Sequence, residues 1–290
     1  MKRFQLHTLL LAVILAGCRS NEPFDNIVTA VNPDAFNYVT STGGRANPAV
    51  FGDAGYYIVF DDDQRIANLT ISNLRVSDSD EPMTLSFSRV PMTYSSDSHE
   101  KERVIMAETL VPDNPDGPSV TLSDVLIVYS HTNSLDPNRT DGIYARFTVD
   151  GRYTVTAYPY RMLADGTTRI DCLTDGKQQI EYEPVYGLRL DPAKLTASLV
   201  VKSLDLAGVE RRIVIRDLTL GFVDNGYTLS MSGATVCAAD KGAVKLVSVS
   251  GTAELRTELK IDMVLSVDGA DYRVAAFLSP NLGNLPSIEL

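Results

Sequence analysis

Few residues of this chain have the types and spacing that catalysis at neutral pH requires. Beyond His7, the histidines are His99 and His131, in the polar stretches SSDSHEKE and YSHTNS. Neither is spaced from another histidine or cysteine as a zinc ligand would be. The run SHEK (98–101) fits Ser-x-x-Lys, but its charged neighbours indicate a solvated loop. The sequence therefore predicts that the protein is not an enzyme, and a carboxylate pair across a groove is the alternative left open.

Loops rich in Asp and Asn raise the possibility of a calcium site, because Ca²⁺ prefers six to eight oxygen ligands. The stretch DPNRTDG (136–142) comes nearest, with Asp136, Asn138 and Asp141 as candidate ligands. Its glycine, Gly142, is one place away from the EF-hand position. Asp and Asn are also ordinary turn residues. We therefore predict no metal ion and no cofactor, and keep these three residues as the alternative.

Two tyrosines, Tyr158 and Tyr160, flank Pro159 at the end of a predicted strand. Exposed tyrosines can stack on sugars or fill a partner's pocket, so both are candidate ligand-binding residues. The alternative is that they cap the core of their module. Cys172 and Cys237 are also open to two interpretations, since they could form a disulfide or lie apart as buried thiols.

The N-terminus carries the most specific motif. Lys2 and Arg3 precede the apolar run Leu9–Leu15, which is too short to span a bilayer. The small residues Ala16 and Gly17 then lead to Cys18. This is the layout of a secretory signal.

The segment Leu15-Ala16-Gly17-Cys18 resembles the lipobox of bacterial lipoproteins. The resemblance implies that residues 1–17 are a signal peptide that is removed. It also implies that the Cys18 thiol and the new N-terminus are acylated and hold the protein on the membrane. Arg19 rather than Asp follows the cysteine, so we expect an outer-membrane lipoprotein of the cell envelope.

The charge of the chain limits its partners. The sequence has 26 basic and 37 acidic residues, and loss of Lys2 and Arg3 with the signal would leave 24 against 37, a net charge of −13. Such a surface repels polyanions, so no nucleic-acid partner is expected. Acyl chains, rather than basic residues, would have to bind the membrane.

The body of the chain has the alternating pattern of antiparallel β strands, interrupted by turn signals such as VDG and VDNG. Residues 18–50 are polar and irregular and are interpreted as a lipidated tether. The remainder predicts an all-β fold of two tandem antiparallel modules, 51–175 and 180–290. Several strands look long, which favours a barrel or a curved sandwich.

An internal repeat supports the two modules. NLTISNLRV (68–76) and SLVVKSLDL (198–206) alternate in phase, skip a step at the same place and resume, as a shared β-bulge would make them do. Further matches pair Met83 with Ile213 and align two hairpins at Gly151 and Gly269, each with an Asp-Gly turn. Alternation alone is the competing explanation.

Long antiparallel meanders behind a lipobox are similar to the calycin-like or lipocalin-like lipoproteins. That resemblance implies a barrel that can hold an apolar ligand. We expect β modules that bind an apolar or glycan ligand, and the alternative is a structural or adhesive surface module that contacts other proteins without a small ligand.

Overall fold

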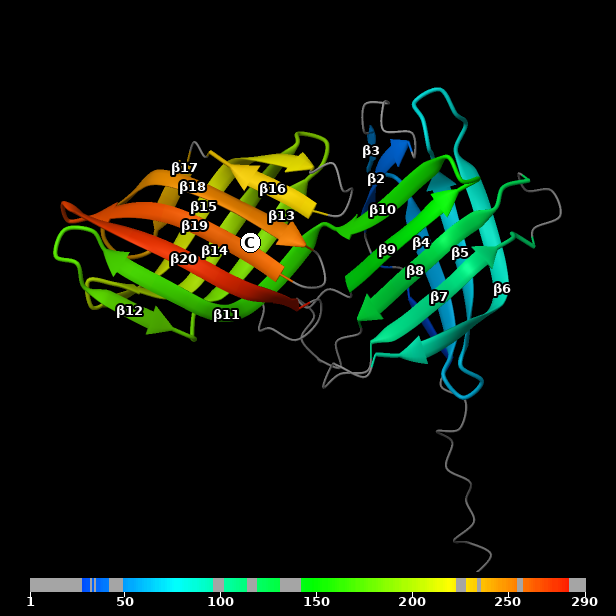
Figure 1. The fold of residues 1–290 in the computed structure, drawn as a ribbon, viewed down its shortest axis with the longest axis horizontal. Helices are drawn as coiled ribbons and strands as arrows, with labels where there is room; N and C mark the ends of the chain where they lie inside the picture. The colour runs from blue at the N-terminus through cyan, green and yellow to red at the C-terminus, as the bar shows by residue number, and fades with distance from the viewer. Residues whose placement is uncertain are drawn as a thin grey trace, which may run out of the picture.

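The computed structural model describes residues 28–31, 33, 35–41, 49–95, 102–113, 119–130, 142–222, 228–233, 236–254 and 258–281. All regular secondary structure within these residues is β strand, which confirms the all-β prediction. The strands form two ten-stranded antiparallel sheets that lie side by side (Figure 1). Each sheet makes one module, as the sequence predicts.

The first module is an open sheet that curls around its own core. Its strand order is β1-β4-β5-β6-β7-β8-β9-β10-β2-β3. The curl brings distant strands together, since the Tyr56 hydroxyl of β4 donates a 2.7 Å hydrogen bond to Asn37 Oδ1 of β2. The strands are β1 (Val28–Val31), β2 (Ala35–Ser41), β3 (Ala49–Phe51), β4 (Gly55–Asp61), β5 (Ile66–Leu74), β6 (Met83–Tyr94), β7 (Arg103–Leu110), β8 (Leu122–Ser130), β9 (Gly142–Val149) and β10 (Tyr153–Pro159).

The second module is a closed barrel, because its strand β11 pairs with both β13 and β20. Eight strands close the ring in the order β11-β13-β14-β15-β16-β18-β19-β20. The short strand β12 pairs with β11, and the short strand β17 pairs with β15. Its strands are β11 (Arg161–Cys172), β12 (Gln178–Glu181), β13 (Val185–Asp191), β14 (Thr196–Leu206), β15 (Val209–Phe222), β16 (Thr228–Ser232), β17 (Val236–Ala239), β18 (Val244–Glu254), β19 (Glu258–Val267) and β20 (Ala270–Asn281).

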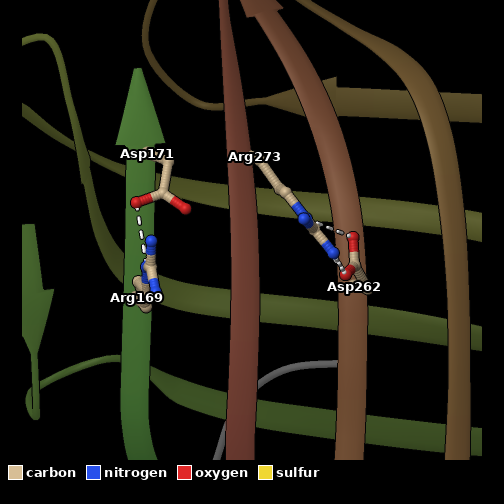
Figure 2. A network of polar contacts seen from close by, with 4 residues as sticks. All are labelled: Arg169, Asp171, Asp262 and Arg273. Atoms are coloured by element: carbon tan, nitrogen blue, oxygen red, sulfur yellow. Dashed lines mark hydrogen bonds and ion pairs between the residues drawn. The ribbon is translucent and has the colours of Figure 1, made fainter. Parts of the chain in front are cut away.

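The barrel closes where β11 pairs with β20, and here the two backbones approach each other closely. A Cβ on Gly166 of β11 would lie 2.4 Å from the carbonyl oxygen of Phe277 on β20, so only glycine fits there. On the outer surface Arg169 bonds to Asp171 at 2.9 Å, and Arg273 Nε bonds to Asp262 Oδ2 at 3.1 Å (Figure 2). The first pair lies within β11 and the second joins β20 to β19, and exposed ion pairs contribute little stability each.

The two modules are copies of one architecture. Strands β4, β5 and β6 correspond to β13, β14 and β15. The two short strands β1 and β2 together take the place of β11, since β1 pairs with β4 and β2 pairs with β10. The register shifts lie at equivalent points, between Ala67/Leu69 and Ile71/Leu74 in one copy and between Ala197/Leu199 and Val201/Leu204 in the other. The shared bulge predicted from the sequence is therefore confirmed.

Three details of the sequence interpretation are corrected. Strands β1 and β2 and most of β3 fall in the predicted 18–50 tether, but they belong to the sheet of the first module. Strand β11 belongs to the second module rather than to 51–175, because closure of the barrel needs a strand that pairs with both ends of the meander. The described modules are therefore 28–159 and 161–281.

The third correction concerns the repeat alignment within β6 and β15. Leu85 pairs with Ile71, and Ile213 pairs with the equivalent Val201, so Leu85 rather than Met83 matches Ile213. The paired residues Val201 and Ile213 are two positions closer in the sequence than Ile71 and Leu85, which shifts the match. Sequence alternation has a period of two, so a shift of two residues leaves the pattern unchanged.

Candidate functional site

An aromatic cluster joins the two modules. The ring of Tyr38 on β2 stacks on Phe222 of β15, with centroids 4.1 Å apart and an interplanar angle of 9°. Tyr158 on β10 stacks on Phe36 at 5.5 Å and meets Phe222 edge-on at 6.0 Å. Strand β10 is thus buried on both faces along most of its length, with its own module on one side and the second module on the other.

The two candidate tyrosines have different environments. Tyr158 is fully buried in the aromatic cluster, and burial raises the pKa of its hydroxyl well above the usual value. Tyr160 lies on the link between the modules. Its hydroxyl donates to the Gly52 carbonyl at 2.8 Å, and its own carbonyl accepts from the Leu190 amide at 2.8 Å. Tyr160 therefore connects the first module to the second and leaves part of its surface accessible.

A groove opens beside Tyr160, where the link meets the barrel. Its volume is about 820 Å³. One wall is formed by the link and by the buried Pro33, and the other by the β13–β14 hairpin. The lining residues are Pro33, Pro159, Tyr160, Arg161, Arg189, Leu190, Asp191, Pro192, Lys194, Thr196, Ala197, Ser198 and Asp217.

The β13–β14 turn shapes one end of the groove. Asp191 Oδ1 accepts a hydrogen bond from the backbone amide of Lys194 at 3.2 Å, and Asp191 Oδ2 accepts one from Lys194 Nζ at 2.9 Å. The hydrogen bond from the Lys194 ammonium lowers the pKa of Asp191. The chain can close this turn because Leu195 adopts a positive φ of 51°, as Arg65 does at 52° in the first module.

Polar side chains from neighbouring strands line the wall of the groove. Arg161 on β11 lies directly opposite Arg189 on β13, which in turn lies opposite Ser198 on β14. Both arginines are exposed and Ser198 is half-buried. This row presents two guanidinium groups and a hydroxyl beside an aromatic ring, an arrangement that suits hydrogen bonding to a polar ligand.

The sequence-derived metal and anchor candidates belong to segments that the structure does not describe. Cys18 and the residues Asp136, Asn138 and Asp141 lie outside the described residues, as do His99 and His131. Within the described part of the chain, no group of three or more His, Cys, Asp or Glu side chains is arranged to hold a metal ion. In the same part, no helix has the length and hydropathy needed to cross a membrane.

The two later cysteines are separate free thiols, on β11 and β17. Cys172 forms a side-chain hydrogen bond with Asp175, and burial raises the pKa of Cys237. Of the two interpretations, the structure agrees with separate thiols rather than a disulfide, although Cys172 and Cys237 are half-buried and not fully buried.

Fold and site together define a two-module, all-β protein with a closed barrel and a polar groove at the junction. No protein family, curated protein or solved structure matches this chain. The groove itself was missed by the sequence interpretation, because Arg161 and Arg189 are 28 positions apart and become neighbours only through the pairing of β11 with β13.

Proposed function

We propose that this protein is a lipid-anchored protein of the cell envelope that binds a glycan in the groove between its two β modules. The observation that carries the proposal is the groove of about 820 Å³, a size within the usual range of ligand sites. Sugars offer hydroxyl groups and an apolar ring face. The groove offers Arg189 and Ser198 for the hydroxyl groups, and Tyr160 with Pro33 and Pro159 for the ring face.

The packing of the barrel favours this surface groove over an apolar ligand held inside. Large inward-facing side chains such as Tyr186, Leu188 and Met263 are completely buried in the core of the second module. The core of the first module is likewise built from its own side chains, including Phe60 and Phe147. An apolar ligand would have to displace these contacts, whereas a glycan in the groove displaces only water.

Attachment to the membrane rests on the lipobox at Leu15–Cys18. More than one acyl chain gives stable anchoring, whereas a single chain gives only marginal binding. Metabolic labelling with a fatty-acid probe should tag the wild type and leave Cys18→Ala unlabelled. Equal labelling of both would exclude this anchor.

Glycan binding can be tested with the full chain in detergent micelles on an array of purified oligosaccharides. Ser198→Trp would fill the groove with an indole, and we expect it to weaken binding at least tenfold. The matched control is Ser248→Trp, because Ser248 is exposed on β18 and is not part of the groove lining. Equal binding by both variants would place the glycan site elsewhere.

The alternative is a structural or adhesive module that contacts other proteins. The closely packed side chains in the described part of both cores favour it, since a ligand inside either module would have to displace them. A wild-type protein that binds no glycan on the array, and that instead captures an envelope protein in a crosslinking experiment on intact cells, would support this alternative over the glycan proposal.

A further inference from the structure

We propose that the groove selects an acidic glycan, whose carboxylate or sulfate group is held between the guanidinium groups of Arg161 and Arg189. This inference rests on the proposed glycan function and names the class of glycan.

The geometry places the two arginines together. Arg161 and Arg189 are direct partners in the pairing of β11 with β13, so their side chains leave the same face of the sheet. The Cβ atoms of directly opposed residues lie roughly 5 Å apart. Two arginine side chains that start this close together can direct both guanidinium groups at one carboxylate or sulfate, with parallel N–H donors.

No described residue neutralises the pair. Neither side chain forms a hydrogen bond or an ion pair within the described part of the chain. The nearby Lys194 is held by Asp191 and repels Arg189 rather than balancing it. The other acidic residue of the lining is Asp217 on β15, a strand that pairs with β14 and not with β13. The site therefore has an excess of positive charge, with donors left for a ligand.

The first module acts as an internal control for this position. The residues equivalent to Arg161 and Arg189 are Ala30 and Val59, which are direct partners in the pairing of β1 with β4. The same architecture thus forms with two small apolar residues at this place. Like charges directly opposite one another destabilise a sheet. Two arginines in the second copy are therefore not required by the fold, and a ligand gives them a role.

The positive charge of the Arg161–Arg189 pair contrasts with the net charge of the whole chain, which is −11. Such a chain repels long polyanions from a distance, while a confined cationic pair attracts a single anionic group at short range. The combination fits a glycan that carries isolated acidic sugars rather than a dense polyanion such as a nucleic acid.

The test compares matched acidic and neutral probes on the full chain in detergent micelles. The probes are oligogalacturonate against its methyl ester, sialyllactose against lactose, and chondroitin sulfate fragments, with inorganic sulfate alone as a separate arm. The variant Arg161→Ala/Arg189→Val recreates the Ala30–Val59 pair of the first module. The control Lys202→Ala/Lys245→Ala removes the same net charge from exposed positions outside the groove lining.

We expect at least one acidic glycan to bind at least tenfold more tightly than its neutral counterpart, and to lose that advantage in the arginine variant but not in the lysine control. The melting temperature of the arginine variant should equal or exceed that of the wild type, because a repulsive pair has been removed.

Unchanged binding by the arginine variant, or equal binding of acidic and neutral forms, would overturn the inference while glycan binding itself stands. Inorganic sulfate that binds as tightly as every acidic glycan would overturn the glycan class. Wild-type protein that binds no glycan at all would overturn both proposals.

Discussion

Phe222 of the second module packs against two tyrosines of the first, and its removal should destabilise the protein in a measurable way. The ring stacks on Tyr38 at 4.1 Å and meets Tyr158 at 6.0 Å. A fully buried Phe→Ala substitution costs about 3–5 kcal/mol. Phe222 is only partly buried, so we expect Phe222→Ala to lower the free energy of unfolding by about 2 kcal/mol. For a chain of this size that corresponds to a fall of roughly 4–8 °C in the melting temperature.

The chain offers a matched control for this substitution. Phe277 on β20 belongs to the same module, but its side chain is exposed. Phe277→Ala should therefore change the stability by less than about 0.5 kcal/mol. Both variants can be compared in thermal unfolding followed by near-ultraviolet circular dichroism, which reports the packing of aromatic rings. If Phe222→Ala destabilised the protein no more than Phe277→Ala, the aromatic cluster would not be what holds the modules together.

Two further predictions concern charged groups. Arg103 Nε donates a 2.8 Å hydrogen bond to Asp62, and the guanidinium group lies over the Phe60 ring. The Arg103 side chain is only 11% exposed. Arg103→Ala should lower the free energy of unfolding in urea by about 3 kcal/mol, because it leaves the Asp62 carboxylate poorly solvated and unpaired. Arg273→Ala, which breaks an exposed pair on the barrel, should cost under about 1 kcal/mol, and equal losses would refute the distinction. The pKa of Asp191 is lowered below its usual 3.8 by the hydrogen bond from Lys194, so its stabilising contribution is present above pH 3.8 and is lost as the pH falls through the lower folded-state value. Thermal unfolding should therefore separate wild type from Asp191→Asn at pH 7, with a smaller difference at pH 2, and a difference that grew on acidification would contradict this.

Much of the fold could be predicted from local sequence patterns. Alternation and Asp-Gly turns are properties of neighbouring residues, so the hairpins at Gly151 and Gly269 could be read directly. The skipped step after Ile71 and after Val201 also left a trace, because a bulge moves every later side chain to the opposite phase. These signals were enough to predict two related β modules.

Features that depend on distant pairing could not be read in this way. Pro33 interrupts the first strand of the first module, so β1 and β2 looked like irregular tether, and only their pairing with β4 and β10 gives them a place. The sequence left Tyr158 open between an exposed binding residue and a cap of the core, because alternation assumes a single covered face, whereas the second module covers the other. The groove has no local signal at all, since it forms where a link, a turn and a strand pair meet.

The central claim is that a glycan binds at the junction of the two modules, and backbone amide hydrogen exchange tests it most directly. The full chain is followed by mass spectrometry with and without the tightest-binding glycan from the array. The account predicts slower exchange in peptides that cover residues 159–161 and 189–198, with the far hairpin around Gly269 unchanged. Protection that avoids both groove segments, or that appears only around the far hairpins, would contradict it.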